Sequence, residues 1–244
     1  MIDSQASNGG MKSAWIDLAQ PLYEGMSCPT LHGVPSFAID ELPSKVAGVT
    51  ISITKMSMGA HTGTHIDAAR HFIADGSTID EYPFDRFFGP GVVLDMQRNG
   101  AVELTAAEFE LATPAIRDGD IVFVYFGSAE DYGTAEYEIH PYLTESAADF
   151  LVSKNVRIFG VDTMTPDMPA AQRREGFDFP VHRRLLANDV LIVENLGAGL
   201  AKLAGKRAIL AAIPLRILGA DGAPIAAIGW VDGAAAAEEG TASL

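Results

Sequence analysis

The sequence predicts a single α/β domain with a mixed sheet. Six short apolar runs rich in β-branched residues are interspersed with two capped helical segments, and no linker, repeat or change of composition separates them. Hydrophobic residues make up 48% of the 244 residues, which at this length suffices for one large core or two small ones. Because nothing divides the chain, we expect one core.

The predicted strands are bounded by glycine, proline or aspartate, and several are apolar throughout, as strands buried on both faces are. They cover residues 49–54, 91–95, 121–126, 156–161, 190–193 and 206–213. A helix is predicted over 105–111, because Thr105 followed by Glu108 forms a capping box. A second helix is predicted over 144–154, ended by Asn155.

Composition narrows the range of partners and compartments. The formal charge of −15, from 17 basic and 32 acidic residues, argues against nucleic acid or an anionic membrane as a partner. The most apolar run, 208–217, contains Pro214 and Arg216 and is too short to span a bilayer. The one cysteine, Cys28, excludes an internal disulfide and fits a reducing cytosol, so we expect a cytoplasmic protein.

The two ends of the chain differ from the middle. Residues 1–12 are polar and lack the basic start and apolar centre of a signal peptide, so they indicate a disordered lead in which Met11 is an alternative start. Residues 234–244 are rich in alanine, glutamate and glycine and indicate a flexible tail. We therefore expect the folded domain to cover residues 13–233.

One segment of eleven residues, from His61 to His71, holds three of the six histidines and an aspartate. Imidazole and carboxylate together suit a borderline divalent ion such as zinc or manganese. Three protein ligands with an open coordination position are typical of a catalytic site, where the ion lowers the pKa of a bound water and polarises a carbonyl. The segment therefore predicts a catalytic metal site.

The local geometry of this segment admits two interpretations. His61 and His65 are four residues apart, as on one helix face, but the residues between them are poor helix formers. In a straight strand, four residues span about 13 Å, too far for one ion. We therefore expect a kinked loop that leaves a strand and bends at Gly63. His71 is expected to move protons, because imidazole titrates near neutral pH, and the alternative is that it is another ligand.

The segment from His61 to Phe72 resembles the signature of the metal-dependent cyclase-like hydrolases, which include the bacterial kynurenine formamidase, isatin hydrolase and trans-dienelactone hydrolase types. The resemblance covers about residues 15–230 and includes a second metal segment with the same twelve-residue spacing from His182 to Glu194. The other matching stretches are residues 17–22, 160–163, 180–186, 193–196 and 214–224. The resemblance implies a swivelling β/β/α domain.

The resemblance also implies a set of site residues. His61, His65 and Asp67 would hold a first ion, and Asp67 would bridge to a second ion held by His182 and Glu194. His71 would be the acid/base. By itself, Glu194 after the apolar run 190–193 would be interpreted as a solvated or capping carboxylate at a strand end. Some members of the family use one ion, so both occupancies are considered.

The substrate-facing stretch departs from the family. Kynurenine formamidases usually carry a Trp-Pro-Gly-Asp type stretch after the opening Pro-Leu, whereas residues 27–33 here read Ser-Cys-Pro-Thr-Leu-His-Gly. The usual proline of the metal motif is Ala69. The resemblance therefore implies the reaction class more directly than the substrate.

The function implied is hydrolysis of a small amide, with an arylformamidase acting on N-formylkynurenine-like substrates as the first candidate. The alternatives are a hydrolase of a cyclic amide or lactone, of the isatin or dienelactone kind, and a non-catalytic metal- or ligand-binding member of the same scaffold. The implied cofactor is one or two divalent ions, zinc or else manganese. The implied partners are a small-molecule substrate and further copies of the chain, as a dimer or tetramer.

Overall fold

The computed structural model describes residues 14–26, 34–43 and 48–231, and its largest element is one mixed sheet. Within the sheet, neighbouring strands follow the order β1-β12-β11-β5-β7-β9-β10-β4. The eight strands are β1 (Ala14–Asp17), β4 (His65–Asp67), β5 (Phe88–Asp95), β7 (Ile121–Tyr125), β9 (Ile158–Val161), β10 (Leu191–Glu194), β11 (Lys206–Pro214) and β12 (Gly222–Val231).

The sheet closes on itself through β12. This strand pairs with β11 along one edge, and along its other edge it pairs first with β4 and then with β1. Seven strands therefore form a closed barrel, to which β1 adds an eighth strand outside the circuit. Strands β5, β7, β9 and β10 run parallel, whereas β4, β11 and β12 pair antiparallel, so the sheet is mixed as the sequence predicts.

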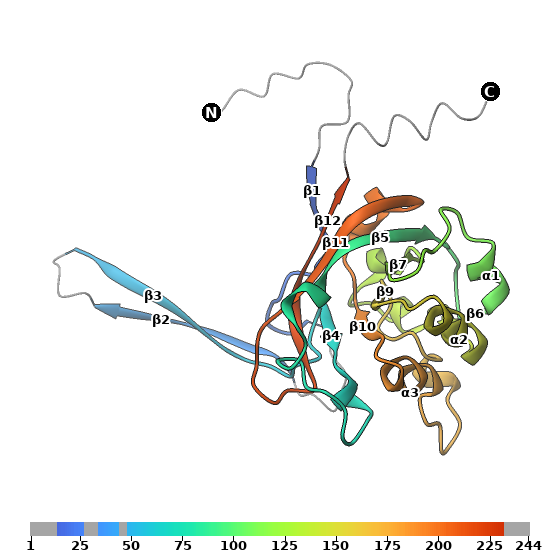
Figure 1. The fold of residues 1–244 in the computed structure, drawn as a ribbon. Helices are drawn as coiled ribbons and strands as arrows, with labels where there is room; N and C mark the ends of the chain where they lie inside the picture. The colour runs from blue at the N-terminus through green and yellow to red at the C-terminus, as the bar shows by residue number, and fades with distance from the viewer. Residues whose placement is uncertain (1–13, 27–33, 44–47, 232–244) are drawn as a thin grey trace.

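Three helices cover the parallel half of the barrel on one side (Figure 1). They are α1 (Ala106–Glu110), α2 (Glu145–Ser153) and α3 (Pro180–Ala187), and α2 packs against both of the others. The capping box of α1 is present, with the Glu108 carboxylate accepting from the Thr105 N–H at 2.6 Å. Helix α2 begins after Thr144, and Asn155 follows its end with a φ of 50°. Two short strands, β6 (Glu103–Leu104) and β8 (Tyr142–Leu143), form a separate pair beside them.

The parallel strands are buried on both faces, which explains their continuous apolar sequence. In β7, Ile121 and Phe123 belong to a hydrophobic cluster to which all seven strands of the barrel contribute residues. This cluster is the interior of the barrel. Val122 and Val124 belong to a second cluster shared with the helices. Alternate residues of one strand thus supply both cores, and the layer order is interior, sheet, helices.

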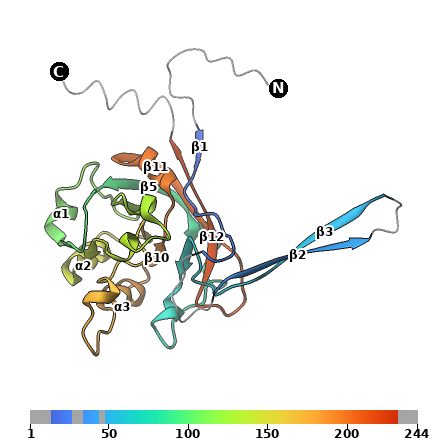
Figure 2. The same ribbon diagram turned by 180° about the vertical axis from the view of Figure 1, so that it is seen from behind.

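A two-stranded ribbon, β2 (Ser36–Pro43) and β3 (Thr50–Ser57), projects away from the barrel (Figures 1 and 2). We call it the arm. Every residue of β3 is exposed, including Ile51 and Ile53, which are 48% and 41% exposed. An isolated two-stranded ribbon is marginally stable in water, so the arm lacks the packing that its apolar side chains would ordinarily supply.

The structure confirms the predicted α/β class, and each predicted strand and helix has a counterpart. Helix α3 and strands β1, β2, β4, β6, β8 and β12 were not predicted. In the described part of the chain, no helix is long and apolar enough to cross a membrane. The expected lead over 1–12, the tail over 234–244, and the stretch 27–33 with Cys28 lie outside the described residues.

Candidate metal centre

The strand register brings distant parts of the sequence to the His61–His71 segment. Strand β4 pairs with β10, which sets Glu194 opposite His65. It also pairs with β12, which sets Gly222 opposite Asp67. Side chains more than 120 positions apart in the sequence therefore meet around one short strand.

A bend at Gly63 turns His61 and His65 towards the same point. Gly63 has a φ of 65°, in the left-handed region that favours glycine, and a Cβ there would lie 2.7 Å from Cδ2 of Leu22. The ring centroids of His61 and His65 are 5.0 Å apart. The predicted kinked loop is therefore confirmed, although residues 65–67 themselves form the short strand β4.

The side chains of His61 and His65 both face Asp67. Its Oδ1 is 2.7 Å from Nδ1 of His61 and 3.4 Å from Nε2 of His65. The carbonyl of Gly63 accepts a hydrogen bond from Nδ1 of His65 at 2.8 Å. Because a carbonyl only accepts, that nitrogen carries the hydrogen, and Nε2 of His65 faces the centre.

His182 and Glu194 complete the same cluster. Nε2 of His182 is 3.4 Å from Oδ2 of Asp67 and 3.1 Å from Oε1 of Glu194. Nε2 of His65 is 3.3 Å from the other oxygen of Glu194. Asp67 therefore faces His61 and His65 with one oxygen and His182 with the other, which is the arrangement that a bridging carboxylate needs.

His182 is held by Asp167, a buried residue that the sequence analysis did not single out. One oxygen of Asp167 accepts from the Val181 N–H at 3.0 Å, and the other accepts from the His182 N–H at 3.0 Å and from its ring Nδ1 at 2.6 Å. The Asp167 carboxylate thus accepts from free backbone N–H groups at the amino end of α3, and it also orients the His182 imidazole. Nothing in the local sequence marks Asp167, because its partners lie 14 and 15 residues later.

Three atoms at the centre of the cluster are buried and have no hydrogen-bond partner: Nε2 of His65, Oδ2 of Asp67 and Oε1 of Glu194. Such atoms are rare in native proteins, because burying a polar group unpaired is costly. Two sets of side chains in the described part have ligand atoms close enough to share an ion: His61, Asp67 and His71, and His65, Asp67 and Glu194. A divalent cation fits these nitrogen and oxygen donors.

The electrostatics of the cluster also favour a cation. Burial lowers the pKa of the His65 imidazole, but the carboxylates of Asp67 and Glu194 that face it outweigh burial and raise that pKa to about 10. Burial likewise opposes the charged form of His182, yet the carboxylates of Asp167, Asp67 and Glu194 around it raise its pKa well above the ordinary value. The buried carboxylates therefore favour positive charge at the centre of the cluster. A metal ion bound there would replace the protons on His65 and His182.

His71 differs from the other histidines of the site. It lies on a short 3-10 helix, Ala69–His71, and its ring stacks on that of His61 with centroids 3.9 Å apart. Its side chain is 24% exposed, against 7% or less for His61, His65 and His182. Burial lowers the pKa of His71, the Asp67 carboxylate opposes this, and the neighbouring His61 and His182 lower it further. These surroundings therefore favour the neutral imidazole.

Asp221 is a second carboxylate for which the sequence analysis gave no role. Its Oδ2 is 3.0 Å from Nε2 of His61 and 3.2 Å from Nδ1 of His71. Asp221 precedes Gly222 in the loop before β12, and an Asp-Gly pair in a loop is ordinary turn chemistry. Only the pairing of β12 with β4 shows that this loop reaches the cluster.

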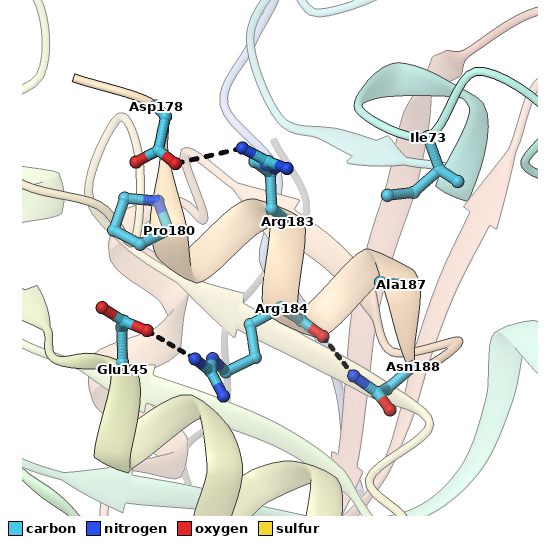
Figure 3. Close-up of a pocket in the computed structure, with 8 residues that line it drawn as sticks. All are labelled: Ile73, Glu145, Asp178, Pro180, Arg183, Arg184, Ala187 and Asn188. Atoms are coloured by element: carbon cyan, nitrogen blue, oxygen red, sulfur yellow. Dashed lines mark hydrogen bonds and ion pairs between the residues drawn. The ribbon is translucent and has the colours of Figure 1, made fainter. Parts of the chain in front are cut away.

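A separate hollow lies on the exposed side of α3 (Figure 3). Its two arginines are already paired, Arg183 with Asp178 and Arg184 with Glu145. His182, on the same helix, is buried and points into the cluster instead. The hollow therefore adds no group to the candidate centre.

The fold and the cluster define an α/β protein with a buried group of histidine, aspartate and glutamate side chains whose donor atoms suit a metal ion. The Cyclase family model matches residues 16–168 of this sequence. A kynurenine formamidase of Bacillus cereus is 30% identical over 220 residues, covering 88% of this chain and 97% of that protein. The chain belongs to the cyclase family.

Solved structures agree with this family. Isatin hydrolase A from Labrenzia aggregata is 27% identical with a TM-score of 0.76, over 90% of this chain and 94% of that one. A protein described as a predicted metal-dependent hydrolase from Bacillus stearothermophilus is also 27% identical, with a TM-score of 0.69, over 89% and 98% of the two chains. Together, these relatives identify the chain as a metal-dependent amide hydrolase of this family.

Proposed function

We propose that this hydrolase is an arylformamidase that acts on N-formylkynurenine-like substrates. The support is the similarity to kynurenine formamidase across nearly the whole length of both chains. The similarity to an isatin hydrolase bound to thioisatinate supports a second candidate, the hydrolysis of a cyclic amide. Both reactions break an amide C–N bond, so the candidates differ in substrate and share one chemistry.

The proposed metal ligands are His61, His65, Asp67, His182 and Glu194. The single observation that carries this assignment is the set of three buried atoms without hydrogen-bond partners, one each from His65, Asp67 and Glu194. Zinc is the first candidate ion and manganese the second, because both accept mixed imidazole and carboxylate donors. We propose two ions per chain, with Asp67 shared between them.

His71 is proposed as the acid/base of the reaction. A divalent ion in this site would polarise the amide carbonyl and activate water. The partly exposed, neutral imidazole of His71 can accept a proton as water attacks and return it to the departing amine. The buried histidines serve poorly for this, because their accessible nitrogens face the carboxylates.

A substrate screen tests the activity. Purified protein reconstituted with zinc or manganese is assayed with N-formylkynurenine, isatin and a dienelactone, and the chelated protein serves as control. We expect the highest kcat/KM for N-formylkynurenine. A higher value for isatin or for the lactone would replace the proposed substrate. Metal-dependent ligand binding without turnover on any of the three would instead support a binding protein.

We also propose that the chain self-associates through the arm, and that it works in the cytoplasm, as its single cysteine suggests. Cross-strand pairing puts Leu42 and Ile51 opposite each other, and Ile53 lies on the same face. These exposed apolar side chains would be covered by a second copy. Light scattering should show a dimer or larger species, which Ile51→Lys with Ile53→Lys disrupts.

The matched control for the arm is Ser52→Lys with Thr54→Lys, which places the same two charges on the opposite face of β3. It should leave the assembly intact. A monomeric wild-type protein at micromolar concentration would contradict the proposal.

A further inference from the structure

The loop before β12 places one carboxylate between two histidines of the site. Oδ2 of Asp221 lies 3.0 Å from Nε2 of His61 and 3.2 Å from Nδ1 of His71, and the two rings are stacked with an interplanar angle of 28°. A single oxygen atom therefore contacts both a proposed metal ligand and the proposed acid/base. Stacked rings that share one acceptor cannot turn independently.

The backbone holds Asp221 in this position from both sides. Its carbonyl accepts from the Ala68 N–H at 2.9 Å, and the carbonyl of Ala220 accepts from the Ile79 N–H at 2.9 Å. The next residue, Gly222, lies under His61, where a Cβ would come within 2.7 Å of the ring Cε1. The backbone that carries Asp221 is therefore fixed by hydrogen bonds, and the absence of a side chain at Gly222 lets the His61 ring approach.

The hydrogen-bond chemistry then determines which nitrogen of each ring carries a hydrogen. An ionised carboxylate only accepts, so Nε2 of His61 and Nδ1 of His71 are both donors to Asp221. When a cation binds beside Asp67, Nδ1 of His61, 2.7 Å from Oδ1 of Asp67, is the nitrogen left to ligate it. In His71, Nε2 is left with its lone pair free to take a proton.

We propose that Asp221 is a positioning residue that fixes the tautomers of His61 and His71 together, and so couples the metal ligand to the acid/base. The inference rests on the roles proposed above for the two histidines. A carboxylate that orients a metal-bound or catalytic imidazole is a recurring device, and its removal typically costs about 10- to 100-fold in metal affinity or activity. Asp221 would orient both the metal ligand His61 and the acid/base His71 with one side chain.

The first test reads the tautomers directly. In metal-free protein with 15N-labelled histidine, wild-type His71 should show hydrogen on Nδ1, and Asp221→Ala should shift it towards the Nε2–H form. This measurement needs no turnover, so it decides the inference even if the proposed substrate is wrong. An unchanged His71 tautomer in Asp221→Ala would overturn the inference.

The second test uses kinetics and chemical rescue. We expect Asp221→Ala to lower kcat about 10- to 100-fold with little change in KM, and to be partly restored by added formate, because the side chain is 44% exposed. Asp221→Asn keeps an acceptor oxygen of the same shape and should lose less. His71→Ala should not respond to formate. A loss in Asp221→Ala that neither formate nor the Asn variant recovers would contradict the positioning role.

A matched control separates positioning from loop stability. Asp80 accepts from the Gly219 N–H at 2.8 Å and so supports the same loop without contacting either ring. Asp80→Ala should lower the melting temperature at least as much as Asp221→Ala, while leaving the His71 tautomer and kcat near wild type. If Asp80→Ala reproduced the kinetic loss, the effect of Asp221 would be structural only.

Discussion

The two halves of the candidate centre are assembled differently. His61, His65, Asp67 and His71 lie within eleven residues, and a single bend at Gly63 brings the first two rings together. His182 and Glu194 come from α3 and β10, twelve residues apart, and reach the first half through strand pairing and Asp167. The first half is built by local backbone geometry and the second by tertiary packing.

This difference predicts how each half responds to change. A substitution in the first half removes one side chain, while the local backbone still holds the remaining side chains of that half in place. A substitution in the second half acts on side chains whose positions depend on buried partners such as Asp167. Asp67 belongs to both halves, since its two oxygens face different histidines.

The largest effect is expected for Asp67→Ala, because it removes the only side chain that the two halves share among the proposed ligands. Metal content measured by elemental analysis should fall from two ions towards none, and hydrolysis should fall to background. Circular dichroism should confirm that the variant folds. A variant that kept its metal would show that the two halves do not depend on Asp67.

His71→Ala should separate chemistry from metal binding within the first half. The variant should retain wild-type metal content and lose turnover by about 10²- to 10⁴-fold, as is typical when a general acid/base is removed. Elemental analysis and steady-state kinetics on the same preparation measure both quantities. An empty site in this variant would reclassify His71 as a ligand, in line with its proximity to His61 and Asp67.

Glu194→Gln tests the second half alone. Its expected effect is the loss of one ion of two, with a partial loss of activity, because His61, His65 and Asp67 remain. In the wild-type protein, two ions bridged by Asp67 should lie about 3.5–4 Å apart. A wild-type protein that holds one ion under metal-replete conditions, and does not respond to this substitution, would favour a mononuclear site.

The smallest effect expected is the pH dependence of the stability of the metal-free protein. The pKa of His65 is raised to about 10 in the folded state, above the ordinary value of 6.5, so the folded state binds the proton more tightly. Stability from this group is therefore fully present below pH 6.5 and is lost as pH rises towards 10. Melting temperatures of chelated protein between pH 6 and 10 should fall, whereas those of metal-loaded protein should fall less.

The same pKa gives the opposite trend for metal affinity. Because an ion must displace the proton on His65, affinity should increase as pH rises over this range. Calorimetric titration with zinc at several pH values measures this affinity. A His65→Gln variant should lose most of both pH trends, and an unchanged trend in that variant would assign the effect to another group.

The sequence by itself determined the α/β class and the first half of the centre. Strands such as 121–126 are continuous apolar runs, and burial on both faces requires that pattern whatever the neighbouring strands are. His61, His65, Asp67 and His71 are close in the sequence, so no long-range contact is needed to predict that they share a site. For the same reason, Gly63 was a recognisable point of bending.

Only the tertiary structure decided which carboxylates complete the site. Glu194 meets His65, and Asp221 meets His61 and His71, through the register of β4 with β10 and β12. Resemblance indicated Glu194 but gave Asp167 and Asp221 no role. Register depends on how the whole barrel closes, and closure is a cooperative result of packing around both cores. No local pattern encodes it, and so an aspartate in an ordinary loop becomes a partner of two histidines only once the chain has folded.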